Sequence, residues 1–189
     1  MPRAGLSSEV LVAEAARLVD ERGAEALTLK AVADRFDVAL PSLYKHLGGL
    51  GDLHARLATL AAHELGAALL RATSGRSRTE ALVAVSEAYR SYAARHPGRY
   101  GYLLRPRPGD AEHARASEEV LAVLYGVLSG YGIADEDALV DATRFLRSTL
   151  HGFVSLEIAG GFAMARSVDR TFERTVLGVD AALRDWSAR

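Results

Sequence analysis

The chain has 189 residues, of which 49% are hydrophobic and 25% are charged, and it contains no cysteine. This length favours one domain or a small two-part unit with a real core, and the lack of cysteine excludes a disulfide framework, thiolate metal sites and a thiol nucleophile. A net charge of −1 excludes a broad basic surface, so any nucleic-acid binding must depend on a few well-placed cations and on helix N-termini.

Three short helices are predicted within the first fifty residues. The first starts after Ser7 or Ser8 and ends at Gly23, because these residue types cap helices at the two ends. Thr28 is the expected N-cap of the second helix, and Pro41 lies in the first turn of the third, where a missing N–H costs nothing. Two short helices joined by a tight turn predict a helix-turn-helix unit.

Helical periodicity continues through the rest of the chain and is interrupted by joints rich in glycine and proline. It predicts six further helices, at about residues 52–72, 79–95, 97–104, 110–130, 135–159 and 168–186. The predicted fold is therefore all-α. An N-terminal helix-turn-helix three-helix domain covers residues 1–50, and a six-helix C-terminal domain covers residues 51–189.

The segments at residues 15–23, 27–33 and 43–47 resemble, in order and spacing, the DNA-binding segment of TetR-type bacterial transcriptional regulators. The resemblance spans residues 8–53. Residues 151–157 are also similar to a segment with a His-Gly pair in the C-terminal domain of one TetR subgroup. Three positions depart from the pattern. Asp37 replaces the turn glycine and should tolerate positive φ, Leu50 replaces a phosphate-binding lysine, and Arg147 replaces the subgroup's tryptophan.

The resemblance implies that the third helix enters the major groove of double-stranded DNA. With Leu43 and Leu47 facing inward, Pro41, Ser42 and Lys45 are the residues that could read bases. Phosphate contacts are expected from the N-terminus of the second helix and from side chains around it. Arg3 could reach the minor groove. The predicted DNA-binding residues are Thr28, Lys30, Pro41, Ser42, Tyr44, Lys45 and His46.

The resemblance also implies that the C-terminal domain binds a ligand and forms a homodimer. The last two predicted helices are apolar over much of their surface, which is typical of a bundle or an interface. We expect them to pair with their symmetry mates, although a core within one chain is the alternative. The predicted interface residues are Phe153, Leu156, Gly160, Phe172, Val176, Val179, Leu183 and Trp186.

Five of the seven tyrosines lie between Tyr89 and Tyr125, which favours an apolar pocket with a few hydroxyl groups. Such a pocket would take a small apolar or aromatic molecule, although each tyrosine could equally seal a helix contact. Ligand would release DNA if it favoured a state with wrongly spaced reading helices. The predicted pocket residues are Tyr89, Tyr92, Tyr125, Phe145, Thr149 and His151.

Other classes of protein find little support in the sequence. No Glu-x-x-His pair, nucleophile motif or phosphate loop is present, and the histidines form no i, i+4 pair, so we expect no enzyme, metal or cofactor. The longest uncharged run, residues 120–134, is shorter than the roughly 20 residues that span a bilayer. The charged N-terminus also lacks a signal core, so a cytoplasmic location is expected. A protein-interaction module that has lost DNA binding is the alternative function.

Overall fold

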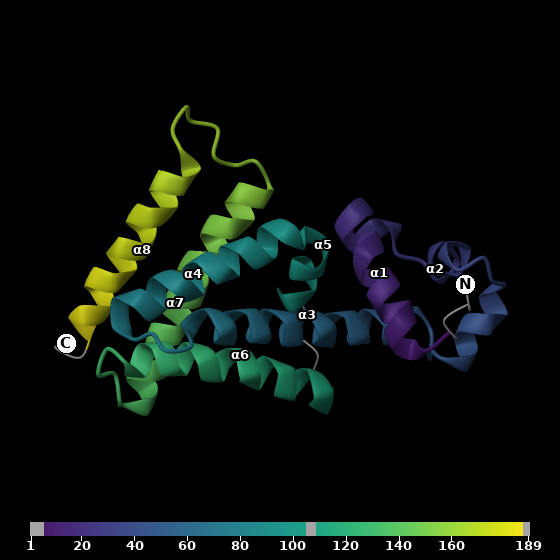
Figure 1. Cartoon of the computed structure of the whole chain (residues 1–189), viewed down its shortest axis with the longest axis horizontal. Coiled ribbons are helices and arrows are strands. Elements are labelled where there is room, and N and C mark those ends of the chain that lie inside the picture. Colours follow the sequence, from purple (N-terminus) through teal and green to yellow (C-terminus); the bar gives the residue numbers. More distant parts are fainter. Residues whose placement is uncertain (1–5, 105–108, 187–189) are drawn as a thin grey trace. The chain divides into compact units, whose positions relative to one another are not determined.

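The computed structural model describes residues 6–104 and 109–186, and every element in these ranges is helical (Figure 1). The first part holds α1 (Ser8–Arg22), α2 (Leu29–Arg35) and two 3-10 helices, η1 (Ala24–Ala26) and η2 (Leu40–Lys45). The remainder holds α3 (Leu50–Thr73), α4 (Arg78–Arg95), α5 (Pro97–Tyr100), the 3-10 helix η3 (Gly101–Leu104), α6 (Ala111–Ser129), α7 (Glu136–Ile158) and α8 (Val168–Arg184). The all-α prediction is confirmed.

The helix ends follow from capping residues. The Ser7 side chain accepts a hydrogen bond from the Val10 amide at 3.3 Å, and Gly23 ends α1 with φ of 82°, a backbone conformation that favours glycine. Two expected elements differ in detail. The third helix is the 3-10 helix η2 rather than an α-helix, and the helix predicted at 97–104 divides into α5 and η3. Short 3-10 segments are common at such connections.

Close backbone contacts divide the chain into two compact units. Unit 1 comprises residues 1–63 and 96–117, and unit 2 comprises residues 64–95 and 118–189. Helices α3 and α6 therefore each contribute residues to both units. This geometric division differs from the predicted boundary after residue 50, because the first part of α3 and the segment around α5 pack with the three short helices. The boundary between the functional domains stays a prediction.

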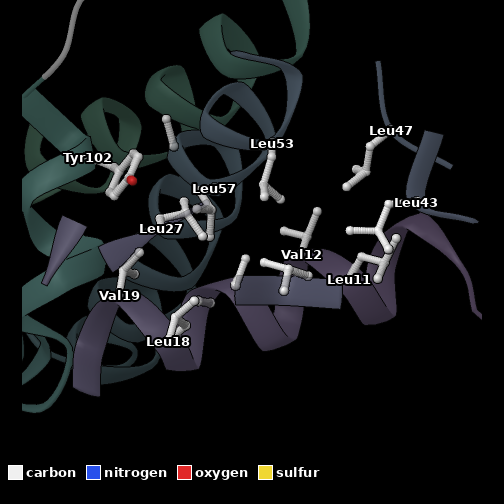
Figure 2. Packing of buried hydrophobic residues seen from close by; sticks show 14 of the residues in the cluster. Leu11, Val12, Leu18, Val19, Leu27, Leu43, Leu47, Leu53, Leu57 and Tyr102 are labelled. Atoms are coloured by element: carbon white, nitrogen blue, oxygen red, sulfur yellow. The ribbon is translucent and has the colours of Figure 1, made fainter. Parts of the chain in front are cut away.

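The core of unit 1 is built by α1, α2, η2, the start of α3 and one residue from η3 (Figure 2). Leu11, Leu43 and Leu53 are fully buried in it, and so is Tyr102, which comes from the distant segment after α5. The Tyr102 hydroxyl lies 2.9 Å from Nδ1 of His54. A buried tyrosine needs such a partner for its polar end.

Helix α5 is fixed to α1 by polar and backbone contacts within unit 1. The Asp20 carboxylate accepts hydrogen bonds from the backbone amide of Arg99 at 2.9 Å and from its Nε at 2.7 Å, and Nδ1 of His96 lies 3.3 Å away. At Gly98, a Cβ atom would collide with the carbonyl group of Val19. Glycine thus permits a backbone approach that no other residue allows.

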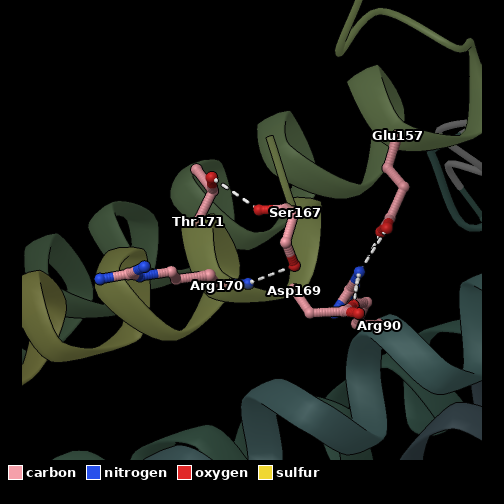
Figure 3. A network of polar contacts seen from close by, with 6 residues as sticks. All are labelled: Arg90, Glu157, Ser167, Asp169, Arg170 and Thr171. Carbon is pink, nitrogen blue, oxygen red and sulfur yellow. Dashed lines mark hydrogen bonds and ion pairs between the residues drawn. The ribbon is translucent and has the colours of Figure 1, made fainter. Parts of the chain in front are cut away.

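Unit 2 is held by contacts among α4, α7 and α8. Leu82, Leu146 and Leu183 are fully buried there. Arg90 on α4 donates to Glu157 on α7, with one bond at 2.8 Å, and to Asp169 on α8 at 2.7 Å (Figure 3). Its guanidinium also lies 4.8 Å from the ring centroid of Phe172, a cation–π distance. Hydrogen bonds that Arg90 donates to Glu157 and Asp169 raise its pKa despite its partial burial.

Candidate nucleic-acid interface

The turn between α2 and η2 sets the direction of η2. Thr28 caps α2, and its hydroxyl accepts a hydrogen bond from the Ala31 amide at 3.0 Å. After α2, Asp37 has φ of 53°, and the Val38 amide donates to the Ala33 carbonyl at 3.2 Å. Asp37 thus adopts the left-handed conformation that glycine usually supplies in such turns. The sequence prediction that aspartate would support this turn is confirmed.

Helix η2 presents a polar face above a buried one. Leu43 and the nearby Leu47 are 0% and 3% exposed, as predicted from their spacing. Pro41, Tyr44 and Lys45 are exposed, and 58% of the Tyr44 surface is open to solvent. Ser42 and His46 are half-buried at the edges of this face. The structure therefore places four of the predicted DNA-binding residues on η2 and a fifth, His46, at its C-cap.

Few cations lie around this face, and the two lysines differ in whether a carboxylate pairs with them. Nζ of Lys30 lies 2.8 Å from Asp34 Oδ2, but both side chains are largely exposed, so the ion pair is weak and easily exchanged for another anion. Within residues 6–104 and 109–186, no carboxylate pairs with Lys45. The prediction from sequence overlooked the Lys30–Asp34 pair, although its i, i+4 spacing on a helix was a usable signal.

The start of α3 has Leu50 at the position where the resemblance implies a phosphate-binding lysine. Leu50 is partly exposed there, and the Asp52 carboxylate accepts a hydrogen bond from the Gly48 amide at 2.9 Å. Burial alone would raise the pKa of Asp52, but the Gly48 amide and Arg56 together lower it. A carboxylate that stays ionised next to Leu50 makes this point unfavourable for phosphate. Arg3 lies outside the described residues.

The predicted pocket residues lie on three helices of unit 2. Tyr89 and Tyr92 are buried on one face of α4, and the Tyr92 hydroxyl donates to Glu64 at 3.1 Å. Tyr125 is half-buried on α6. On α7, Phe145 packs against Trp186 with ring centroids 5.3 Å apart.

Two further polar residues of the predicted pocket lie on α7. The Thr149 hydroxyl donates to the carbonyl of Phe145 at 2.8 Å, which occupies its proton within the helix. The His151 ring lies 3.2 Å from the Ser155 hydroxyl. Burial, and secondarily Arg147, lowers the pKa of His151, so its neutral form is favoured. A pocket that contains these six residues stays a prediction.

Most of the predicted interface residues are buried within their own chain. Phe153, Phe172, Val176, Val179 and Leu183 are each at most 7% exposed and belong to the packing of unit 2. Leu156 and Gly160 are exposed, whereas Trp186 is half-buried. The regular apolar spacing on α8 therefore marks the face turned toward its own unit. The large apolar side chains that are exposed on α7 and α8 are Leu156, Ile158 and Leu177.

Residues 6–104 and 109–186 contain no group of three histidine, aspartate or glutamate side chains placed to hold a metal ion. None of the helices in the same ranges combines the length and hydrophobicity needed to cross a bilayer.

Comparisons with known proteins agree with this geometry. Residues 11–49 match the family described as bacterial regulatory proteins, tetR family, and residues 82–179 match the tetracyclin repressor-like C-terminal domain. The chain is 38% identical over 159 residues to the uncharacterized HTH-type transcriptional regulator Rv0681 of Mycobacterium tuberculosis, which covers 83% of this chain and 72% of the relative. It is 32% identical to the uncharacterized HTH-type transcriptional regulator YobS of Bacillus subtilis, over 82% of this chain and 81% of the relative.

Solved structures with the same fold include two with bound small molecules. ActR of Streptomyces coelicolor in complex with (S)-DNPA superposes with a TM-score of 0.68 at 16% identity, over 95% of this chain and 98% of ActR. A TetR variant from Acinetobacter baumannii in complex with minocycline gives a TM-score of 0.68 at 20% identity, over 97% of each chain. With the family matches and the helix-turn-helix unit, these findings show that the chain belongs to the tetR family of DNA-binding bacterial transcriptional regulators.

Proposed function

We propose that the protein is a ligand-responsive repressor that binds a near-palindromic operator as a homodimer. The observation that carries this proposal is the exposed face of η2, where Pro41, Tyr44 and Lys45 stand opposite the buried Leu43. Placed in a major groove, Lys45 and Ser42 would meet base edges, and Tyr44 a phosphate. The capped N-terminus of α2 would contribute backbone N–H groups to a second phosphate.

Few cations are available for this task, so one subunit would bind weakly. Arg3, Lys30 and Lys45 supply about three phosphate or base contacts per subunit and about six in a dimer, which corresponds to a log–log salt slope of about −5. Two linked copies gain a high effective concentration at half-sites about 34–36 Å apart. Because one subunit has so few cations, we expect a dimer on a palindromic site to be needed for useful affinity.

The exposed apolar side chains on α7 and α8 support a second copy of this chain as the partner. Leu177 on α8 is 58% exposed, and Leu156 and Ile158 on α7 are 51% and 45% exposed. Gly178 on α8 and Gly152 on α7 add small exposed positions, which allow a facing helix to approach closely. The proposed interface is thus the outer face of α7 and α8, rather than the inner face that the sequence pattern marked.

We further propose that a small apolar or aromatic molecule releases the operator. The buried tyrosines of α4, and the small molecules bound by ActR and TetR, support this class of effector. Helix α3 contributes residues to both units and would connect the two functions. A coupling free energy of about 1–3 kcal/mol weakens DNA binding roughly 5- to 150-fold. An effector that raises the melting temperature but leaves operator affinity unchanged contradicts this part.

The central test is a fluorescence-anisotropy titration with DNA from upstream of the protein's own gene. Lys45→Ala and Tyr44→Ala should each weaken binding at least about fivefold, because each removes a contact to base or phosphate in both subunits. Arg71→Ala is the matched control. It removes one exposed cation from α3 in unit 2 and should leave the affinity unchanged.

The same titration distinguishes a repressor from the alternative function. A protein-interaction module that has lost DNA binding would leave the operator candidates and unrelated DNA equally unbound at low salt. Its Lys45→Ala variant would then behave as the unmodified chain does. The exposed Leu50 at the start of α3 is the observation that favours this second candidate.

A further inference from the structure

A polar pocket of about 290 Å³ lies within unit 2 and is lined by residues that have been given no role above. Four side chains line it: Arg78 and Thr79 from the start of α4, Tyr131 from the turn before α7, and Arg184 from the end of α8. Two guanidinium groups and two hydroxyl groups thus meet in one small space. The proposed regulatory function uses none of them.

A buried carboxylate, Asp180, is hydrogen-bonded to three of the four lining side chains. Asp180 is 6% exposed, and its Oδ1 accepts hydrogen bonds from the hydroxyls of Thr79 at 2.7 Å and Tyr131 at 2.5 Å. Its Oδ2 accepts from Nε of Arg184 at 2.9 Å, and Arg184 also donates to the Thr79 hydroxyl. Both hydroxyl protons and the charge of Arg184 are therefore committed to Asp180.

Arg78 supplies the charge that remains. Its Nε donates to the neutral carbonyl of Gly130 at 3.1 Å, and no carboxylate in the described part of the chain pairs with it. Its backbone has φ of 48°, a left-handed conformation that is costly for arginine. A Cβ on Gly130 would lie 3.3 Å from the Arg78 amide nitrogen, so the backbones approach closely here. Arg78 is exposed, and together with Arg184 and Asp180 it leaves one positive charge in excess at this site.

We infer that this cavity binds the carboxylate group of a small organic acid. The two terminal nitrogens of Arg78 form a planar fork that matches a carboxylate, and a single excess charge matches a single negative one. A phosphate dianion has more charge and more acceptor oxygens than these donors can satisfy, because Thr79 and Tyr131 already donate to Asp180. This inference does not depend on DNA binding.

Calorimetric titration of the full chain with propionate, at constant ionic strength in a buffer free of carboxylates, tests the inference. We expect saturable binding in the millimolar range, with a Kd at least about tenfold weaker in Arg78→Gln, which loses the charge-assisted hydrogen bonds. Arg71→Gln is the matched control, because it removes an exposed guanidinium of unit 2 that does not line the cavity. It should bind propionate as the unmodified chain does.

Three outcomes overturn the assignment. The first is a linear heat signal with propionate up to about 50 mM, which means no site of useful affinity. The second is equal propionate affinity of the two variants. The third is saturable binding of inorganic phosphate without binding of propionate, which would place a different class of anion in the cavity. Circular-dichroism melting of Arg78→Gln establishes that a loss of binding occurs in a folded protein.

Discussion

At the scale of single residues, the Lys30–Asp34 pair determines how much of the small positive charge is free for DNA. The two groups are 2.8 Å apart on the surface of α2. An exposed i, i+4 pair is worth about 0.3–0.5 kcal/mol. Any phosphate that engages Lys30 must first displace Asp34, so the pair acts against DNA binding in both subunits of a dimer.

Asp34→Asn should therefore strengthen operator binding about two- to fivefold, since each subunit no longer has to break the ion pair. The measurement is the operator dissociation constant at low salt. Glu87→Gln is the control, because it changes the net charge equally through an exposed residue of α4 in unit 2. If Asp34→Asn and Glu87→Gln have the same effect, net charge alone is responsible and Lys30 is not at the DNA.

Asp180 gives a second prediction at this scale, which concerns pH. Burial by itself raises the pKa of this carboxyl, but hydrogen bonds from Tyr131 and Thr79, together with Arg184, lower it below its ordinary value of 3.8. A depressed pKa contributes stability that is present above the unfolded-state value and is lost as pH falls through the folded-state value. The free energy of unfolding should thus decrease below about pH 4.

Asp180→Asn should reduce this acid-dependent decrease, and should lower stability at pH 7 by about 1–3 kcal/mol because the charged partner is removed. Urea unfolding at several pH values measures both quantities. Glu87→Gln, an exposed acid on α4, should leave the pH profile unchanged. An Asp180→Asn profile that runs parallel to that of the unmodified chain would show that this carboxyl does not titrate with unfolding.

At the scale of elements, the contact between α5 and α1 depends on one missing side chain. Gly98→Ala should destabilise the protein by about 1–3 kcal/mol, because its new methyl group would press on the backbone at Val19 and separate the two helices. Chemical denaturation measures this loss. Gly101→Ala is the matched control: its Cβ would meet nothing within 4 Å, and φ of −61° suits alanine. Equal stability of the two variants would contradict the close approach.

The sequence predicted most helix ends, and it predicted which face of a helix is buried. It did not predict whether that face is covered by the same chain or by a second copy. Ser7, Thr28 and Gly23 are capping residues whose signal is local, and each marks a real helix end. The stripe of Phe172 and Val176 on α8 shows only that this face is buried. Periodicity does not distinguish burial within a chain from burial between chains. The role of Gly98 left no sequence signal, because a glycine at a close approach resembles any other glycine.

At the scale of the whole molecule, the proposed dimer tests which apolar face of unit 2 meets a partner. Leu177→Glu should convert the dimer to a monomer, because it places a charge in the middle of the proposed interface. Operator binding should weaken as well, since one half-site remains per molecule. Sedimentation equilibrium measures the mass in solution.

Leu70→Glu provides a closely matched control. Leu70 on α3 is 59% exposed, practically the same as Leu177, yet it lies outside the proposed interface. Its substitution should leave the dimer intact. A monomer produced by Leu70→Glu, together with a dimer retained by Leu177→Glu, would move the interface to another surface of the molecule.

Unit 1 is assembled from two separated stretches of chain, and this restricts how the regulator can be recombined. A chimaera that joins residues 1–63 to an unrelated C-terminal half would lack Arg99, the partner of Asp20, and Tyr102, which is fully buried in the same core. The DNA-reading portion is therefore not a transferable cassette. Exchange of operator specificity between relatives is better achieved by grafting the solvent face of η2 than by swapping the N-terminal segment.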